Sequence, residues 1–152
     1  MSRLRTRFTD ESESPGLLLW RVGNRWQAAI RDALAPYDLT HTQFVLLASL
    51  TWLRRERDEP VTQRELADYA MTDVMMTSQV VRTLESKGFI ERRPHPGDSR
   101  ARDLVVTAAG LDRVNAAIVA VEECDATFFA AAGPTFLGLL AGLQRLAGEP
   151  SA

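Results

Sequence analysis

The sequence predicts a mainly α-helical chain of about six helices that carries one small β-hairpin. Three observations support this fold class. Apolar residues recur at helical spacing through most of the 152 residues. The stretch from Pro60 to Lys87 reads as two helices joined by a tight turn. Residues 89–107 read as two strands around a turn-rich tip. Together the last two features make a winged helix-turn-helix.

The two helices of this pair have recognisable starts and ends. Thr62 followed by Glu65 is a capping box at the start of the first helix. The second helix is predicted at roughly residues 73–87, with Thr72 or Asp73 as its N-cap and Gly88 after its end. Its predicted inner face consists of Val74, Thr77, Val80, Val81 and Leu84.

The outer face of the second helix carries side chains that suit a DNA major groove. Gln and Arg make paired hydrogen bonds to base edges, Ser is adaptable, and apolar groups contact thymine methyls. A helix that faces only solvent more often carries Glu and Lys at such positions. Met76 has a second interpretation, as a filler of gaps in the core. The outer residues are Met75, Met76, Ser78, Gln79 and Arg82.

The hairpin that follows is basic at its tip. Its strands are predicted at residues 89–93 and 103–107, with a turn-rich tip at 94–102. From Arg82 to Arg102 there are six Lys or Arg residues and three acidic residues, a local balance of +3, whereas the whole chain is at −2. This concentration of positive charge is the footprint that phosphate neutralisation requires.

An ordered set of short motifs runs over nearly the whole chain: Thr40-His41-Thr42-Gln43-Phe44, Glu65-Leu66-Ala67, Leu84 to Arg92, Asp98-Ser99-Arg100, Val106-Thr107 and Gly110. In these motifs the chain resembles the MarR family of bacterial regulators. The resemblance implies that Arg100 enters the minor groove, that Asp98 orients the wing and that the outer helix face lies in the major groove. Arg102 is expected to hold phosphates, or else to pair with Asp98 or Asp103.

The winged helix-turn-helix at residues 60–107 is called the reading segment below. Four further helices are predicted before and after it. They are predicted at residues 17–35, ended by Pro36; 40–54, with a Thr40 and Gln43 capping box; 108–129, capped by Thr107; and 135–147, after Gly133-Pro134. The helix at 40–54 is apolar around much of its circumference. We therefore expect it to be buried between the reading segment and the rest of the chain.

The first helix and the last two have apolar faces that a monomer would leave exposed. The prediction is a twofold dimer in which these helices interlock, and the MarR resemblance implies the same. Two recognition helices would then lie one DNA turn apart on a pseudo-palindromic operator. Residues 1–36 and 108–152 are assigned to a helical dimerisation lobe, and residues 37–107 to the winged helix-turn-helix lobe.

Many proteins of the resembled family respond to small, often aromatic, anionic compounds bound between the two lobes. On this resemblance, four residues are candidate contacts of an effector ligand: Trp20, Trp26, His41 and Trp52. The alternative is that these aromatic side chains belong to the core.

The sequence lacks the residue patterns that metal sites and the common enzyme active sites require. His41 and His95 stand apart without the neighbouring Cys of a metal site, and no phosphate loop or nucleophile turn occurs. We expect no catalysis, no metal and no cofactor.

Cys124 is the only cysteine and is predicted to lie in the core. No window approaches the ~20 apolar residues of a membrane span, and no signal core follows the basic N-terminus, so a cytoplasmic protein is expected.

Two functions from different classes explain the reading segment. The first is a homodimeric transcription regulator, a repressor by resemblance, that binds double-stranded DNA. The second is a winged-helix module for protein-protein interaction without DNA binding, since fold does not fix function. The second predicts an acidic or hydrophobic reading face, and the exposed Gln79, Arg82 and basic wing argue against it.

Overall fold

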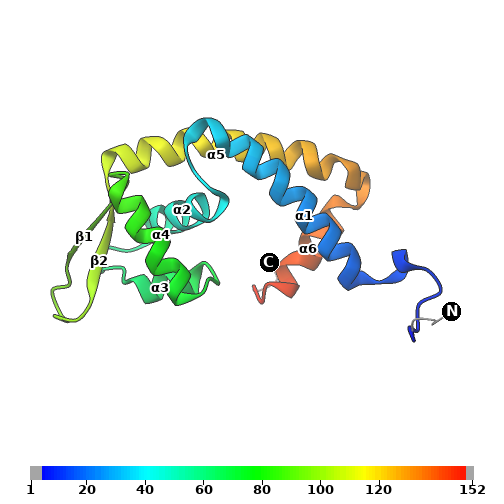
Figure 1. The fold of residues 1–152 in the computed structure, drawn as a ribbon, viewed down its shortest axis with the longest axis horizontal. Helices are drawn as coiled ribbons and strands as arrows, with labels where there is room; N and C mark the ends of the chain where they lie inside the picture. The colour runs from blue at the N-terminus through cyan, green and yellow to red at the C-terminus, as the bar shows by residue number, and fades with distance from the viewer. Residues whose placement is uncertain (1–4, 150–152) are drawn as a thin grey trace.

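The computed structural model describes residues 5–149, most of them in helices (Figure 1). The α-helices of this part are α1 Pro15–Leu34, α2 His41–Glu56, α3 Gln63–Tyr69, α4 Val74–Ser86, α5 Ala108–Phe129 and α6 Phe136–Leu146. Short 3-10 helices span Glu11–Glu13, Ala35–Tyr37 and Ala130–Thr135. Strands β1 Ile90–Pro94 and β2 Arg102–Val106 pair as an antiparallel hairpin, which with its tip is the wing. The predicted fold class is confirmed.

The elements form an arch (Figure 1). Helix α5 runs along the top. Helices α2, α3 and α4 and the wing lie at the end where α5 begins, and α6 with the N-terminal half of α1 lies at the other end. The C-terminal half of α1 packs along α5 and joins the two ends.

The helix starts follow the predicted capping residues. Thr40 Oγ1 accepts the Gln43 N–H at 3.2 Å, and Gln43 Oε1 accepts the Thr40 N–H at 3.2 Å. Thr62 and Glu65 make the same reciprocal pair at the start of α3. Asp73, one of the two N-caps expected for α4, accepts the N–H three residues later. These local signals fix the starts of α2, α3 and α4.

The hairpin strands are each offset by one residue from their predicted positions. Phe89, predicted in the first strand, is buried and donates its N–H to the Leu84 carbonyl at 2.9 Å, so it closes α4 instead. Gly88 allows this closure with a φ of 76°. Thr107, predicted in the second strand, caps α5. Both residues are used by the neighbouring helices, and the ladder runs between them.

The start of α5 is in close contact with the chain that leaves α4. Thr107 Oγ1 accepts the Gly110 N–H at 3.0 Å and donates to the Gly88 carbonyl at 2.6 Å. Gly110 is buried, and a Cβ built on it would overlap the carbonyl oxygen of Phe89. The backbone of Phe89 therefore approaches the first turn of α5 so closely that only glycine fits at position 110.

Helix α2 passes through the middle of the core beneath α5. Leu46, Leu47 and Leu50 are fully buried. They pack in one cluster with side chains of the other elements, including Ile30, Leu34, Leu66, Val81, Leu84 and Leu104. The expected burial of α2 is confirmed for these residues, whereas Trp52 near its C-terminal end is 51% exposed. The far side of the C-terminal half of α2 is not covered within the described chain.

Two cations tie the linker between α1 and α2, residues 35–40, to the reading elements. Lys87 Nζ donates to the Asp38 carbonyl at 2.6 Å and lies 3.2 Å from the Asp38 carboxylate. Arg113 Nη1 of α5 donates to the Tyr37 carbonyl at 2.7 Å. The Arg113 guanidinium also lies 5.1 Å from the centre of the Phe89 ring. The linker is thus held from α4 and from α5 at adjacent residues.

Helix α6 buries none of its side chains within the described chain. Its apolar residues are exposed over a wide area: Phe136, Leu137, Leu139, Leu140, Leu143 and Leu146. Helix α1 adds Leu18, Leu19 and Val22. The helical run Ala108–Leu146 is long and apolar enough to pass as a membrane span by length and composition, against the sequence expectation. Gly133, with φ 54° and ψ −136°, breaks that run before α6.

Candidate nucleic-acid interface

Helix α4 presents a polar and apolar stripe outside the core. Met75 is 76% exposed, Gln79 and Arg82 are exposed, and Ser78 is half-buried. On the opposite side Thr77, Val81 and Leu84 are buried against α2 and α3. The four predicted base-reading residues therefore lie on the side of α4 that faces away from the core.

Two predictions about the first turn of α4 need correction. Val74, predicted on the inner face, is 45% exposed. Met76 is 39% exposed and outside the core cluster, so its interpretation as a core filler is wrong. The core contact of α4 begins only at Thr77, whose hydroxyl lies 2.8 Å from that of Thr72. Met71, with a φ of 53°, lies in the turn between α3 and α4 and precedes this exposed first turn.

The tip of the wing is ordered by Asp98. Its carboxylate accepts the Arg100 N–H at 2.8 Å, and its carbonyl accepts the Ala101 N–H at 3.1 Å. Arg100 and Arg102 are exposed. Asp98 therefore sets the backbone turn from which the Arg100 side chain projects.

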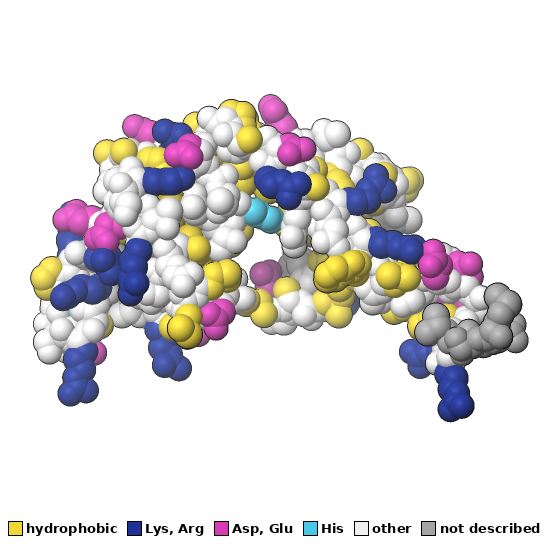
Figure 2. Space-filling view, in the orientation of Figure 1, with side chains coloured by type: hydrophobic (Ala, Val, Ile, Leu, Met, Phe, Trp, Pro, Cys, Tyr) yellow, Lys and Arg dark blue, Asp and Glu magenta, His cyan; other side chains and the backbone are white. Residues whose placement is uncertain are grey.

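Three arginines of the basic segment have no carboxylate within 4 Å among residues 5–149: Arg82, Arg100 and Arg102. Arg92 pairs with Glu85 at 2.7 Å, and Arg93 pairs with Glu91 at 2.8 Å. The unpaired cations are thus the three that the sequence assigned to DNA. Figure 2 shows Lys and Arg side chains grouped over the wing end of the arch, at the left of the view.

Asp103, one of the two acids expected as an alternative partner of Arg102, pairs elsewhere. Its carboxylate accepts from Arg54 Nη1 at 3.2 Å and from the Val61 N–H at 3.0 Å. The next residue of β2, Leu104, donates its N–H to the Val61 carbonyl at 2.8 Å. These bonds attach the base of the wing to the chain before α3 and leave Arg102 without an acidic partner in the described chain.

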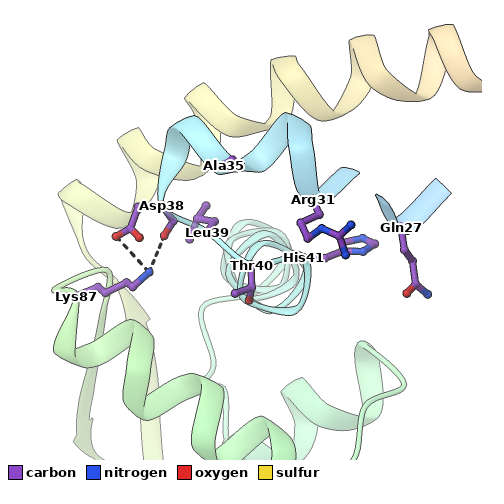
Figure 3. A pocket seen from close by; sticks show the side chains of 8 residues that line it. All are labelled: Gln27, Arg31, Ala35, Asp38, Leu39, Thr40, His41 and Lys87. Atoms are coloured by element: carbon purple, nitrogen blue, oxygen red, sulfur yellow. Dashed lines mark hydrogen bonds and ion pairs between the residues drawn. The ribbon is translucent and has the colours of Figure 1, made fainter. Parts of the chain in front are cut away.

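A cavity of about 380 Å³ lies between α1, the linker and the C-terminal end of α4 (Figure 3). Its lining combines cationic, polar and apolar groups: Gln27, Arg31, Ala35, Asp38, Leu39, Thr40, His41 and Lys87. In Figure 3 Lys87 reaches Asp38 at one side of the cavity, and Arg31 and His41 lie toward the other side. An anion in this cavity would meet the positive charges of Arg31 and Lys87, and the Asp38 carboxylate that pairs with Lys87.

The four aromatic ligand candidates are not brought together. Trp26 and His41 are in contact edge to face, with ring centroids 5.0 Å apart, and Trp26 Nε1 donates to Asp125 at 2.7 Å. Trp20 is 70% exposed on α1. Trp52 lines a different cavity, between α2, β2 and α5. Of the four, only His41 lines the cavity beside the linker.

Sequence reasoning missed the cations of this cavity. Gln27 and Arg31 are four residues apart on α1, so they share one helix face, and that spacing was a usable signal. Lys87 enters from a helix far away in the sequence. The residues around Lys87 in the sequence do not indicate that its side chain lines this cavity.

His41 gives the folded protein a pH-dependent stability. Burial lowers the pKa of His41 from its usual 6.5, and the Asp125 carboxylate opposes this change. The unfolded chain therefore binds more protons at His41 than the folded protein as the pH falls through 6.5. We expect the free energy of unfolding to decrease from about pH 7.5 to about pH 5.5, and His41→Gln to make this decrease smaller. Urea titrations of both proteins across that range measure it, and equal slopes would contradict the assignment.

Comparison with known proteins adds to this geometry. The sequence model of the MarR family matches residues 39–101, from the linker to the wing tip. The chain is 47% identical over 141 residues to the HTH-type transcriptional regulator YdcH of Bacillus subtilis (strain 168), itself uncharacterized; the match covers 93% of this chain and 95% of the relative. It is 30% identical over 115 residues to the HTH-type transcriptional repressor Rv2887 of Mycobacterium tuberculosis, over 76% of this chain and 79% of the relative.

Solved structures match along the whole arch. The Mycobacterium tuberculosis MarR family protein Rv2887 in complex with DNA has a TM-score of 0.69 and 28% identity, over 88% of this chain and 97% of the other. CouR from Rhodococcus jostii RHA1 bound to p-coumaroyl-CoA has a TM-score of 0.77 and 26% identity, over 92% and 96%. The likeness therefore includes α1, α5 and α6 as well as the helix-turn-helix.

Proposed function

Since the chain belongs to the MarR family and is a DNA-binding transcriptional regulator, we propose that it is a homodimeric repressor that reads a pseudo-palindromic operator with α4 and the wing. One observation carries the proposal. The unpaired Arg82, Arg100 and Arg102 lie at the same end of the arch as the exposed Gln79. The relatives are named as regulators, which confirms the prediction that the chain is no enzyme and favours DNA binding over a protein-protein module.

The residues divide into two roles. Gln79 and Arg82 read base edges in the major groove, with Met75 and Ser78 beside them. Arg100 enters the minor groove, and Arg102 holds phosphates at the edge of the wing. The bond from the Arg100 N–H to Asp98 supports this division, because it fixes the wing tip before DNA arrives.

The dimer is proposed from the apolar surface at the far end of the arch. Helix α6 has no buried residue of its own, and its Leu139, Leu140 and Leu143 are each about two-fifths exposed. A contiguous apolar surface of this kind is rarely left in water. A second copy, related by a twofold axis, would bury the apolar faces of α6 and α1. The two reading segments would then lie on the same side of the dimer.

The repressor is proposed to be released by a small anion with an apolar body. CouR, a structural neighbour, is bound to p-coumaroyl-CoA, an acidic aromatic conjugate. In this chain Arg31 and Lys87 supply positive charge on the cavity beside the linker, and His41 supplies a ring. The anion would compete with Asp38 for Lys87 and so reach the end of α4. Since operator DNA lies in the bacterial cytoplasm, the protein would act there.

The decisive variant is Arg100→Ala. We expect it to weaken operator binding by about 1–3 kcal/mol and to lower the salt dependence, because one cation is removed from the DNA surface, with the fold intact. Fluorescence anisotropy on the intergenic DNA upstream of the protein's own gene, at several salt concentrations, measures both quantities. Arg93→Ala is the matched control, because Arg93 lies on the same wing but already pairs with Glu91.

The outcomes separate the parts of the proposal. Unchanged binding by Arg100→Ala would remove the wing from the interface. An affinity of the parent protein that does not vary with salt would overturn DNA binding through these arginines. Selection from random duplexes should show relaxed sequence preference for Gln79→Ala, whereas Arg102→Ala should lose affinity for all sequences alike.

A further inference from the structure

We propose that Met71, Met75 and Met76 make operator binding sensitive to oxidation, such that hypochlorous acid converts their thioethers to sulfoxides and releases the DNA. This inference rests on the proposed function, since it assigns a modification to the same reading surface. The three residues are three of the four methionines in the chain. The fourth, Met1, lies outside the described residues.

The three side chains are gathered at one place and are accessible. Met71 is 80% exposed in the turn between α3 and α4, Met75 is 76% exposed and Met76 is 39% exposed on the first turn of α4. None belongs to the core cluster. Val74 and Tyr69, 45% and 49% exposed, extend the same apolar tip. The fold therefore leaves all three methionines outside the core and accessible to reagents in solution.

The three methionines lie at or just before the N-terminal turn of α4, where an apolar side chain can contact DNA. The N-terminal turn of a recognition helix is the part that enters the major groove, where apolar side chains contact thymine methyl groups. Methionine suits such a contact because it is flexible and polarisable. The same thioether is the group that oxidants attack. The sulfur atom that makes the side chain suitable for the apolar contact is therefore also the atom that is oxidised.

The reaction is a two-electron oxygen transfer. The sulfur lone pair attacks the oxygen of hypochlorous acid, a sulfur–oxygen bond forms, and the oxygen–chlorine bond breaks. Chloride leaves and the hydroxyl proton is released, so the thioether becomes a sulfoxide while the oxidant is reduced by two electrons. The sulfoxide is polar, and against a thymine methyl it would lose its water without gaining a partner. Methionine sulfoxide reductases reverse the change.

The single cysteine is poorly placed to give the same response. Cys124 is half-buried near the C-terminal end of α5, whereas α4 lies at the end of the arch where α5 begins (Figure 1). Burial raises the pKa of its thiol, and Asp125 and Asp32 add to the rise. The thiolate is the reactive form, so this thiol is disfavoured as a nucleophile. Cys124→Ser is accordingly a suitable background, because it leaves the reading surface untouched.

The first experiment uses the full chain with Cys124→Ser. The protein is treated with hypochlorous acid in small molar excess, the sulfoxides are located by peptide mass spectrometry, and operator affinity is measured by anisotropy. We expect the Kd to rise tenfold or more when Met71 and Met75 are oxidised, and to return after incubation with both methionine sulfoxide reductases. Verified sulfoxides with an unchanged Kd would overturn the proposal.

Two variants in the same background test the residues themselves. Leucine at all three positions, Met71→Leu, Met75→Leu and Met76→Leu, is apolar and resists oxidation. The measured quantity is its own ratio of Kd after and before treatment, which should stay close to one whatever its starting affinity. Met75→Gln, a polar group of similar length, should weaken binding without any oxidant. A leucine variant that remains as sensitive as its parent would refute the assignment.

The failure of this inference is distinct from that of the proposed function. If the untreated protein shows no salt-dependent binding to the operator, the proposed function fails before any oxidant is added. If the untreated protein binds and the oxidised protein binds equally well, only the role of the methionines is lost. Circular dichroism before and after treatment separates loss of contact from loss of fold.

Discussion

Gly110→Ala is expected to destabilise the protein more than any other single methyl group added to a described glycine. A Cβ on Gly110 would lie 2.9 Å from the carbonyl carbon of Phe89 and closer still to its oxygen. The neighbour is backbone, which cannot move aside as a flexible side chain can. The cost should reach or exceed the upper end of the ~1–3 kcal/mol typical of overpacking. Urea denaturation at a fixed protomer concentration measures it.

Gly16→Ala is the matched control for this substitution. Gly16 lies in the first turn of α1, and nothing lies within 4 Å of a Cβ built there. Stability should be unchanged or slightly raised, because alanine favours helix over glycine by up to about 1 kcal/mol. A Gly110→Ala protein as stable as the Gly16→Ala protein would contradict the close contact between α5 and Phe89.

Leu139→Glu combined with Leu143→Glu should convert the protein to a monomer and abolish tight operator binding. Both residues lie on the apolar face of α6, and a carboxylate buried at an interface without a partner is strongly disfavoured. A monomer holds one half-site at a time, so the apparent affinity should fall by about 100-fold or more. Sedimentation analysis gives the mass, and anisotropy gives the affinity.

Arg145→Glu is the matched control on the same helix, since it places a carboxylate at an exposed position that is already polar. It should remain dimeric. A double variant that stays dimeric would exclude α6 from the interface. A double variant that becomes monomeric yet binds the operator with undiminished affinity would overturn the two-copy reading of DNA.

The elements of this fold were predictable where the signal is local. The caps at Thr40, Thr62, Asp73 and Thr107 each satisfy backbone donors within three residues of themselves, so the sequence alone determines those helix starts. The break at Gly133 is equally local. Periodicity likewise identified the buried side of α4 from Thr77 onward.

Predictions failed where tertiary contacts decide. Val74 fits the apolar period of α4 but is 45% exposed, and no pattern within α4 shows which of its turns a neighbouring helix covers. The pairing of Asp103 with Arg54 and that of Lys87 with Asp38 each join residues 49 positions apart. The family resemblance placed Trp20 and Trp52 on helices that would line one crevice, whereas Trp20 is exposed on α1 and Trp52 lines a different cavity. A resemblance between helices does not determine which side of each helix another helix covers.

The two cations on the linker have a mechanical consequence. Lys87 ends α4 and Arg113 stacks on Phe89 at the root of the wing, yet both donate to carbonyls of the adjacent residues Tyr37 and Asp38. A rotation of α1 that moves this linker would therefore act on α4 and on the root of the wing together. In the proposed dimer, an effector that tilts α1 would change the separation between the two reading surfaces.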